Sequence, residues 1–292
     1  MLDDLAAMVL CAGLGTRLRP LTDELAKPMV PIGDRPAVAH VVERVRLAEP
    51  RQVVVNVHHR PDDLHAWAHR EGIVVSPEEE LLGTAGGLAN AAALLGDGNV
   101  LVWNGDILSE LDPRELVAAF NAEAALAALA VRPRPAGEGN VGIAAGGTIA
   151  RLRTERFAEE VEGGEFLGIH VVGRTLRATL PRSGCLVGDV YLPALRAGQR
   201  LHVFRCGAPF VDVGTLEAYL EANRAWLAAR DLSSWSAQSA RLDAAIDGSV
   251  VGARAHVESS LEGCVVWPDA HVAKGGPLRH AVITPRGIVR AR

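Results

Sequence analysis

Residues Leu10–Pro36 read LCAGLGTRLRPLTDELAKPMVPIGDRP, and this stretch decides how the first part of the chain folds. The apolar run at 6–10 ends in a loop of small residues at 11–16. A strand that runs into a glycine-rich turn points several backbone N–H groups at one spot, which suits a phosphate chain. Glycine permits close approach of the backbone and positive φ, and the cations Arg17 and Lys27 follow to neutralise bound phosphate.

Two common phosphate-binding motifs are excluded by single positions. A P-loop ends in Gly-Lys-Ser/Thr, whereas Gly15 is followed here by Thr16 and Arg17. The dinucleotide-binding fingerprint needs a third glycine, and that position holds Leu18. The full string instead closely resembles the signature of the sugar-1-phosphate nucleotidyltransferases, the nucleotide-sugar pyrophosphorylases, which reads G-x-G-T-R-L-x-P-L-T and then K-P. One departure is Ala26, where proline usually precedes the lysine.

The composition is that of an ordinary globular protein. The chain has 292 residues, of which 49% are hydrophobic and 22% charged, enough for one large domain and one small domain. A net charge of -5 provides no basic field for nucleic acid, so we expect no such partner. The four cysteines lack C-x-x-C spacing, which is typical of reduced thiols. Because neither a signal-peptide pattern nor about 18 consecutive apolar residues are found, we expect a cytoplasmic protein without membrane contact.

Apolar runs of strand length alternate with segments of helical periodicity. Strands are expected at 7–10, 53–57, 73–75, 100–103 and 166–172, and helices at 37–47, 62–70, 87–95, 113–121 and 215–230. Glycine pairs at 146–147 and 163–164 indicate hairpin turns. The alternation predicts a Rossmann-like α/β domain with a mainly parallel sheet and helices on both faces. Since ligands of such sheets bind beyond the carboxyl ends of the strands, we expect the loops at 11–17 and 104–106 to share one cleft.

The last fifty residues have a different pattern. Residues 250–257, 265–272 and 282–289 each place apolar residues at both ends of a polar turn, and blocks repeating every 15 to 17 residues are typical of a solenoid. They resemble the left-handed parallel β-helix appended to many nucleotidyltransferases; the alternative is a few hairpins packed on the main domain. Few coils bury little surface alone, so we expect them to cap the main domain or a neighbouring subunit of a homo-oligomer.

The sequence therefore predicts three consecutive parts. A nucleotidyltransferase catalytic domain is expected over residues 1–230, a serine-rich linker over 231–243 and the short β-helix over 244–292.

Two aspartates have contexts that suit a metal ion. Asp106 ends a predicted strand in W-N-G-D, and Asp212 lies in F-V-D-V-G-T, just before the long predicted helix. Mg²⁺ binds through one or two carboxylates and takes its remaining ligands from phosphate and water. Taken singly, Asp106 is explained as a turn residue and Asp212 as a carboxylate near a helix start. The resemblance implies that Asp106 and Asp212 together hold Mg²⁺.

The resemblance also implies roles for the residues of the glycine loop. Arg17, a bidentate donor, would bind the β- and γ-phosphates, and Lys27 would lie near the α-phosphate and the incoming sugar phosphate. These two residues and Asp106 form the expected catalytic set, whereas Arg19 reads as a solvated surface cation. The expected nucleotide contacts in this region are Leu10, Ala12, Gly13, Gly15, Thr16, Arg17, Asn104 and Asp106.

Residues 78–87, EEELLGTAGG, carry the second match. They resemble the family's base-reading loop, E-x-L-G-T-A-G; the alternative is an acidic turn before a helix N-terminus. Glu78 or Glu80 would accept a hydrogen bond from a ring N–H of the base. Guanine, uracil and thymine all offer such a donor, so the base stays open. The backbone expected to read the base edge is that of Gly83, Thr84 and Ala85.

The sugar side rests on fewer matches. The residues that fall where family members line the sugar pocket are Gly142, Glu165, Gly168 and Asp189, besides Lys27. Many relatives carry an E-K-P segment there, and this chain has a short glycine-rich stretch at 156–165 instead. His65 and His69 have the i, i+4 spacing of a metal pair but no accompanying acidic zinc motif, so we expect surface or packing histidines.

The resemblance covers essentially the whole chain and implies the reaction of an NTP with a sugar-1-phosphate to give an NDP-sugar and pyrophosphate. The attacking phosphate oxygen is already an anion, so neither a protein nucleophile nor a general base is needed. The base-reading loop and the tail look most like mannose-1-phosphate guanylyltransferases. The F-L-G-I segment looks more like N-acetylmuramate-1-phosphate uridylyltransferases, and glucose-1-phosphate thymidylyl- or uridylyltransferase comes third.

An alternative of another class is a catalytically silent, sugar-nucleotide-binding regulatory subunit. Such a protein should have lost a metal aspartate or the loop arginine. All of these positions are kept here, which favours an enzyme.

Overall fold

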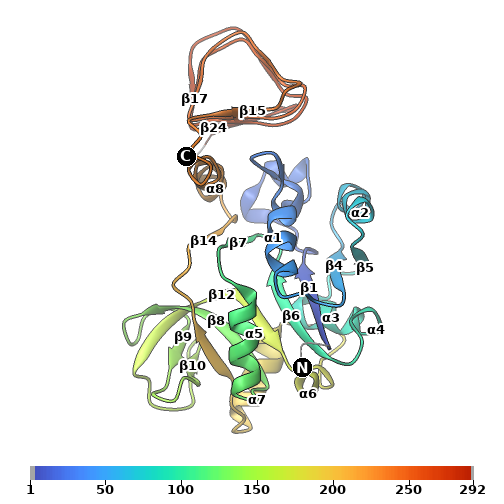
Figure 1. Cartoon of the computed structure of the whole chain (residues 1–292), viewed down its shortest axis with the longest axis vertical. Helices are drawn as coiled ribbons and strands as arrows, with labels where there is room; N and C mark the ends of the chain where they lie inside the picture. The colour runs from blue at the N-terminus through green and yellow to red at the C-terminus, as the bar shows by residue number, and fades with distance from the viewer. Residues whose placement is uncertain (1–3, 291–292) are drawn as a thin grey trace. The chain divides into compact units, whose positions relative to one another are not determined.

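The computed structural model describes residues 4–290 and divides into two compact units. The first consists of Met1–Gly13 and Val41–Phe210, and the second of Leu14–His40 and Val211–Arg292 (Figure 1). The outermost residues of the predicted domains, 1–3 and 291–292, lie outside the described part. All four cysteines are free thiols. Between residues 4 and 290, none of the helices combines the length and the apolar character that crossing a bilayer requires.

A parallel sheet forms the centre of the first unit. β1 (Leu5–Leu10) lies between β4 (Val53–Val57) and β6 (Asn99–Asn104) and runs parallel to both, and β5 (Val74–Pro77) pairs parallel with β4. β1 and β6 are near-continuous apolar runs because their central residues are buried on both faces. The predicted fold class, α/β with a mainly parallel central sheet, is confirmed.

Beyond β6 the sheet continues with antiparallel strands. β12 (Glu162–Val172) pairs with β6, with β8 (Ala127–Arg134) and with β9 (Val141–Ile143). Glycines 146–147 turn the chain between β9 and β10, as expected. The predicted turn at 163–164 is wrong, because both glycines lie inside β12. A Cβ on Gly163 would lie 2.3 Å from the carbonyl oxygen of Pro135, so close backbone packing requires this glycine. The remaining strands of this unit are β7 (Ile107–Ser109), β10 (Ile149–Leu152), β11 (Glu155–Arg156) and β13 (His202–Arg205).

The five helical segments that the apolar spacing predicts are present, although the segment expected at 87–95 is divided between α3 and α4. The short helices α6 and α7 were not predicted. Asp112 caps α5 by accepting a hydrogen bond from Arg114 N at 3.0 Å, and Pro113 occupies the first turn. α2 packs against β4 and β5, and α5 packs against β8 and β12. The bounds are α1 (Ala37–Arg46), α2 (Pro61–Arg70), α3 (Gly83–Asn90), α4 (Ala92–Leu95), α5 (Pro113–Ala122), α6 (Arg174–Arg177), α7 (Leu192–Arg196) and α8 (Leu216–Ala228).

A buried ion pair supports the loop between β8 and β9. Arg151 Nε donates to Glu160 Oε2 at 2.8 Å, and the two side chains are 8% and 3% exposed. The guanidinium also donates to the carbonyls of Glu138 and Gly139, and Gly137 N donates to Glu160 Oε1 at 2.7 Å. The hydrogen bonds from Arg151 lower the pKa of Glu160 to about 2, against the opposing effect of burial.

Replacing Glu160 by glutamine is expected to lower the free energy of unfolding by about 3–5 kcal/mol, because the buried guanidinium loses its counter-charge. The folded-state pKa of Glu160 lies below its unfolded value, so this stabilisation is complete above about pH 5 and is lost as the pH falls toward 2. Denaturant unfolding near pH 7 and near pH 3 measures both effects. Glu155→Gln, which breaks the surface pair with Arg196, is the control and should cost much less. Equal losses in the two variants would contradict the assignment.

The second unit joins the segment at 14–40 to α8 and the C-terminal coils. β2 (Pro31–Ile32) and β3 (Arg35–Pro36) form a hairpin that contacts α8. The hydroxyl of Tyr219 donates to the Pro31 carbonyl at 2.7 Å and accepts from Trp267 Nε1 at 2.9 Å. Three separate parts of the chain are therefore tied together at one tyrosine on α8.

The C-terminal coils form a parallel β-helix, which has a triangular outline in Figure 1. Its first sheet contains β15 (Trp235–Ser236), β18 (Val250–Val251), β21 (Val265–Val266) and β24 (Ala281–Thr284); its second contains β16 (Arg241–Leu242), β19 (His256–Val257) and β22 (His271–Val272); its third contains β17 (Ile246–Asp247), β20 (Leu261–Glu262) and β23 (Leu278–Arg279). Small and β-branched side chains fill the interior, among them Val257, Cys264 and Val272.

The third repeat block behaves differently from the first two. β24 still pairs parallel with β21, but it then turns back and pairs antiparallel with β25 (Gly287–Arg290). The β-helix thus ends in a hairpin, so the alternative of hairpins applies to this last block. Thr284 Oγ1 donates to Glu24 Oε1 at 2.5 Å, and Arg286 donates to the Asp23 carbonyl at 3.3 Å. The terminal hairpin therefore contacts the segment between Arg17 and Lys27.

Candidate functional site

The carboxyl ends of β1 and β6 lie side by side in the first unit. Leu10 and Asn104 are paired in register, and Gly105 N donates to the Leu10 carbonyl at 2.9 Å. A Cβ on Gly105 would lie 2.7 Å from Cys11 Sγ, so a larger residue there would require the neighbouring atoms to shift. Burial is the larger cause, and the negative charge of Asp106 the smaller cause, of a raised pKa of the Cys11 thiol. Asp106 is half-buried and lies at these strand ends, where the glycine loop begins.

A bulge in β12 brings a predicted sugar residue to the same edge. Gly168 has φ 71°, and a Cβ there would lie 2.4 Å from Asn104 Nδ2. The pairing of β12 with β8 shifts register between Phe166 and His170, which accounts for this conformation. Gly13 is exposed, and among the described residues no atom beyond its two chain neighbours lies within 4 Å of the position a Cβ would occupy. The edge therefore combines Asn104, Asp106 and Gly168 with a backbone segment that a ligand can approach.

Glu78 is buried, with 6% of its surface exposed. Its Oε1 accepts from Asn56 Nδ2 at 2.7 Å, and its Oε2 accepts from Leu82 N at 3.1 Å. Asn56 Oδ1 in turn accepts from Cys11 N at 2.7 Å. This chain of hydrogen bonds connects the residue after β1 to the start of the predicted base-reading loop, whereas Glu80 is exposed. Glu78 thus positions two predicted nucleotide-binding segments relative to each other.

The predicted base-reading loop is bound to the segment at 182–186. Ala85 N donates to the Gly184 carbonyl at 2.9 Å, and Leu186 N donates to Thr84 Oγ1 at 2.8 Å. Asp189 Oδ2 accepts from Cys185 N at 2.7 Å, in the turn that follows. The structure therefore brings Asp189, predicted for the sugar, close to the residues predicted for the base.

Gly83→Ala is expected to destabilise the protein by about 2–4 kcal/mol. Gly83 has φ 74°, and a Cβ there would lie 2.4 Å from the Gly184 carbonyl oxygen, so left-handed strain and a backbone clash add together. Gly72→Ala is the matched control, because Gly72 has φ 66° and open space around it. It should show only the backbone penalty of about 1 kcal/mol. Thermal unfolding of both variants checks this, and equal losses would show that the packing against Gly184 is unimportant.

Gly142 and Glu165, which the sequence also predicts for the sugar, contact the charged residues Glu160 and Arg134 of the first unit. A Cβ on Gly142 would lie 2.5 Å from Glu160, so the buried ion pair with Arg151 already requires a glycine there. Glu165 Oε2 accepts from Arg134 at 3.1 Å. Their assignment to the sugar stays a prediction.

The second unit brings together Arg17, Lys27 and Asp212. Arg17 Nη2 lies 3.4 Å from Asp212 Oδ2, and Lys27 Nζ lies 3.7 Å from Asp212 Oδ1. The Lys27 side chain is 10% exposed, whereas that of Arg17 is 64% exposed. Two positive charges therefore flank one carboxylate, the buried lysine on one oxygen and the open arginine on the other.

Two glycines hold this cluster in place. Gly15 has φ 63°, and a Cβ there would lie 2.8 Å from Thr22 Cγ2 and 3.0 Å from Lys27 Cβ. Gly214 lies beside the Arg17 guanidinium. A Cβ on Gly214 would lie 2.7 Å from Arg17 Nη1. The glycines of the G-x-G-T-R and D-V-G-T strings thus let the backbone come directly against the two cations.

The donor set suits magnesium at Asp212. Its buried Oδ1 has no hydrogen-bond partner, even though Lys27 Nζ lies 3.7 Å away. A carboxylate oxygen left without a donor is the ligand type that Mg²⁺ prefers. Asp106, the other predicted ligand, is also a half-buried carboxylate and lies in the turn between β6 and β7.

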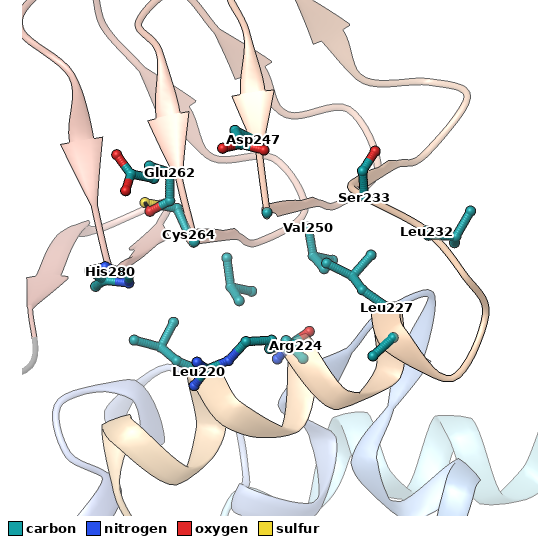
Figure 2. Close-up of a pocket in the computed structure, with 15 residues that line it drawn as sticks. Leu220, Arg224, Leu227, Leu232, Ser233, Asp247, Val250, Glu262, Cys264 and His280 are labelled. Carbon is teal, nitrogen blue, oxygen red and sulfur yellow. Dashed lines mark hydrogen bonds between the residues drawn. The ribbon is translucent and has the colours of Figure 1, made fainter.

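A pocket of about 330 Å³ lies elsewhere in the second unit, between α8 and the β-helix. Figure 2 shows Leu220, Arg224 and Leu227 on the helix facing Val250, Cys264 and His280 on the coils. None of the residues predicted for substrate or metal lines it.

Sequence reasoning missed Asn56, Gly184 and Gly214 as parts of the site. The sequence did contain a signal for Asn56. It is the one polar residue in the run VVVNV, and a buried amide needs hydrogen-bond partners. Gly184 and Gly214 had none, because their neighbours along the chain do not reveal which backbone or side chain packs against them.

Comparison with protein families gives a match over residues 6–229 to the family described as nucleotidyl transferase. A mannose-1-phosphate guanyltransferase of Schizosaccharomyces pombe is 30% identical over 229 residues, which make up 73% of this chain and 62% of that protein. The N-acetylmuramate alpha-1-phosphate uridylyltransferase of Caulobacter vibrioides is 43% identical over 108 residues, covering 34% of this chain and 45% of the relative. The chain thus spans less than two thirds of the length of either relative.

Among solved structures, HddC from Yersinia pseudotuberculosis, crystallised as a complex with GMP-PN, superposes with a TM-score of 0.63. The alignment covers 76% of this chain and 99% of that one, at 20% sequence identity. At this level of identity, the similarity establishes the fold.

Proposed function

We propose a function from one premise: this chain belongs to the nucleotidyl transferase family. We propose that it is an enzyme that transfers a nucleotidyl group from an NTP to a sugar-1-phosphate and releases pyrophosphate. The observation that carries the proposal is the cluster of Arg17, Lys27 and Asp212 around Gly15. In it, two cations and a carboxylate oxygen that accepts no hydrogen bond meet a glycine turn. These are the groups that a triphosphate and its metal ion require.

The reaction needs positioning and charge neutralisation rather than a protein nucleophile. An oxygen of the sugar phosphate attacks the α-phosphorus of the NTP, a new P–O bond forms, and the bond to the β-phosphate oxygen breaks. The electron pair leaves with pyrophosphate. Arg17, exposed and bidentate, would bind the departing β- and γ-phosphates, and Lys27 would hold the α-phosphate beside the incoming sugar phosphate.

Asp106 and Asp212 are the proposed magnesium ligands. When bound, Mg²⁺ supplies positive charge that offsets the negative charge developing on the phosphate oxygens. The hydrogen bonds from Asn56 and Leu82 hold Glu78 in place, which supports the proposal that the loop at 83–85 reads the nucleobase. The N–H of Ala85 is already donated to the Gly184 carbonyl, so the proposed contacts come from Gly83 and Thr84.

The proposed first substrates are GTP and mannose-1-phosphate. The similarity to the mannose-1-phosphate guanyltransferase over 73% of this chain supports this choice. The second candidate is transfer of a uridylyl group to N-acetylmuramate-1-phosphate, because the 43% identity to the Caulobacter vibrioides protein is higher, although over a shorter segment.

Incubating the protein with Mg²⁺, each NTP and a panel of sugar-1-phosphates, and measuring pyrophosphate release, tests this function. We expect release to require one NTP and one sugar-1-phosphate together, with GTP and mannose-1-phosphate the best pair. A best rate with UTP and N-acetylmuramate-1-phosphate would select the second candidate. Binding of a nucleotide-sugar without turnover in any combination would support a regulatory subunit and overturn the proposal.

We assign the catalytic chemistry to residues 1–230, with 231–243 as a linker and 244–292 as a capping β-helix that would also serve a homo-oligomer. The proposed linker contains β15 and β16, which pair with β18 and β19 of the β-helix. In the structure these two strands already belong to the β-helix, which argues against a free linker over their residues. Limited proteolysis tests the division: preferential cleavage within 231–243 supports a linker there, and resistance would contradict it.

A further inference from the structure

One face of the β-helix carries a ladder of histidines and carboxylates. Arg241, His256 and His271 are in register on β16, β19 and β22, at intervals of fifteen residues. Asp243 and Glu258 lie two residues after the first two members. Asp243 and Glu258 come directly after β16 and β19, and their contacts with His256 and His271 place them on the same outer surface. Val257, by contrast, lies in the core.

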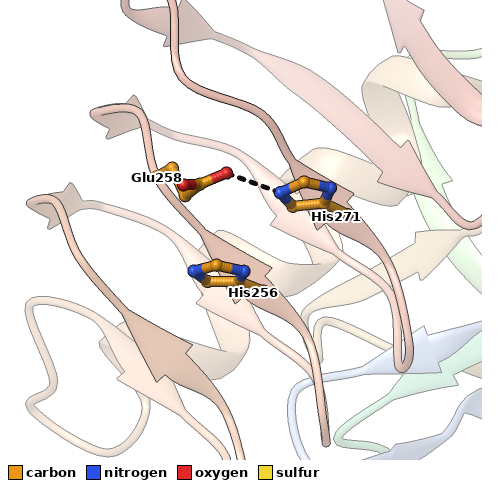
Figure 3. Close-up of side chains that lie close together, drawn as sticks. All are labelled: His256, Glu258 and His271. Carbon is orange, nitrogen blue, oxygen red and sulfur yellow. Dashed lines mark hydrogen bonds and ion pairs between the residues drawn. The ribbon is translucent and has the colours of Figure 1, made fainter.

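The contacts along this ladder follow one rule: each carboxylate reaches the histidine of the next coil. Asp243 Oδ2 lies 2.7 Å from His256 Nε2, and Glu258 Oε2 lies 2.7 Å from His271 Nε2. The imidazole rings of His256 and His271 are stacked, with centroids 5.1 Å apart and planes within 11° of parallel. Figure 3 shows Glu258 beside both rings on neighbouring strands.

The geometry points to a binding site for a borderline transition-metal dication, of which Zn²⁺ is the reference, formed by His256, Glu258 and His271. We propose that the ion joins two successive coils of the β-helix and keeps a further coordination position open to solvent. One potential ligand atom from each of the three side chains lies within 4.8 Å of the others. Donor atoms around a tetrahedral zinc ion at about 2.0–2.2 Å are roughly 3.4 Å apart, so rotations of the three side chains are enough to complete the site.

The ligand types select the metal. Two imidazoles with one carboxylate suit Zn²⁺ and its neighbours in the first transition row, whereas Mg²⁺ prefers oxygen alone. Asp243 completes the arrangement as an orienting partner of His256, the role that carboxylates commonly have behind metal-bound histidines.

The site is independent of the proposed reaction. Its residues lie on the coils, and none is among those proposed to bind substrate or magnesium. The chain also offers an internal comparison: His65 and His69 on α2 are exposed at i, i+4 spacing, but no third ligand accompanies them among the metal-binding groups found in residues 4–290. We therefore expect the three-ligand site to bind more tightly than this helical pair.

Calorimetric titration of the full chain with Zn²⁺, in the presence of excess Mg²⁺, tests the proposal. The expected result is one high-affinity ion per chain and a rise in Tm on binding. His271→Ala and, separately, Glu258→Gln should each weaken that affinity by at least about tenfold to a hundredfold, and Asp243→Asn by a smaller factor. The double variant His65→Ala/His69→Ala is the control, because it removes two imidazoles, the same number that the proposed site contains. It should leave the Zn²⁺ affinity unchanged. Substituting Co²⁺ should give the visible absorption of a four-coordinate ion in the wild type.

Three outcomes would overturn the proposal: no saturable Zn²⁺ binding by the wild type, wild-type affinity in both His271→Ala and Glu258→Gln, or loss of the high-affinity ion in the α2 double variant. Circular dichroism shows that each variant is folded. Using two separate ligand variants keeps the test decisive if one of them fails to fold. Pyrophosphate release is not a readout here, so failure of this site leaves the proposed function standing.

Discussion

Replacing Asp106 by asparagine is expected to lower kcat for pyrophosphate release by about a thousandfold or more, while the protein keeps its fold. The substitution retains the size of the side chain but removes the negative charge that would hold Mg²⁺ opposite the triphosphate. Asp106 lies half-buried in the turn after β6. The hydrogen bond from Gly105 N to the Leu10 carbonyl stabilises this turn, and the substitution leaves that bond intact. Steady-state kinetics over a range of Mg²⁺ concentrations measures the effect.

The matched control for this prediction is Asp63→Asn, which neutralises an exposed carboxylate in the first turn of α2. Its activity should stay within about twofold of wild type, because surface charges of this kind contribute little. Near-normal pyrophosphate release by Asp106→Asn would remove Asp106 from the proposed metal site. A loss of activity accompanied by unfolding would instead assign it a structural role, and circular dichroism distinguishes the two.

Lys27→Gln is expected to reduce kcat/KM by about a hundredfold to a thousandfold. The ammonium group of Lys27 is mostly withdrawn from water and fixed beside Asp212, so it is available as a preorganised positive charge for the α-phosphate. Asp212 still has Arg17 at 3.4 Å in the variant, so we expect the local fold to survive. The reduction should appear mainly in kcat if the lysine acts on the transition state rather than on NTP binding.

Arg19→Gln is the control for Lys27. Arg19 belongs to the same motif, but its side chain is 57% exposed and its ion pair with Asp23 measures 3.3 Å, so its removal should change kcat/KM by no more than about twofold. Equal losses in the two variants would mean that the overall positive charge of the segment matters and that the buried position of Lys27 does not.

Much of the fold was predictable because its signals are local. Helical spacing and β-branched runs depend on neighbours within one or two turns, so the helices and the central strands were found at nearly their observed positions. Glycines 163–164 were misread for the opposite reason. Two adjacent glycines indicate a turn locally. Here, however, Gly163 packs against the carbonyls of Pro135 and Glu138, and Gly164 packs against Val131, all of which are remote in the sequence.

For the candidate site too, the sequence predicted some features and only the fold supplied others. The string from Gly13 to Lys27 and the context of Asp212 were enough to name the cations and a carboxylate that meet in the second unit. They could not show that Lys27 is buried while Arg17 is open, because burial depends on Thr22, Gly15 and the residues around Asp212. Likewise, the sequence names Glu78 as a candidate, but only the fold directs its carboxylate toward Asn56.

By itself, the sequence determined the chemical groups of this protein and the elements that carry them: a glycine turn with two cations, the strand-end aspartate Asp106 and a repeating tail. Periodicity and motif strings record these features because each arises among residues close in the chain. Tertiary structure alone decided which groups face each other, such as Asp212 with Lys27 and Glu258 with His271. Those pairings depend on close packing between distant segments, where a single methyl group at Gly83 or Gly163 would already clash with a backbone carbonyl.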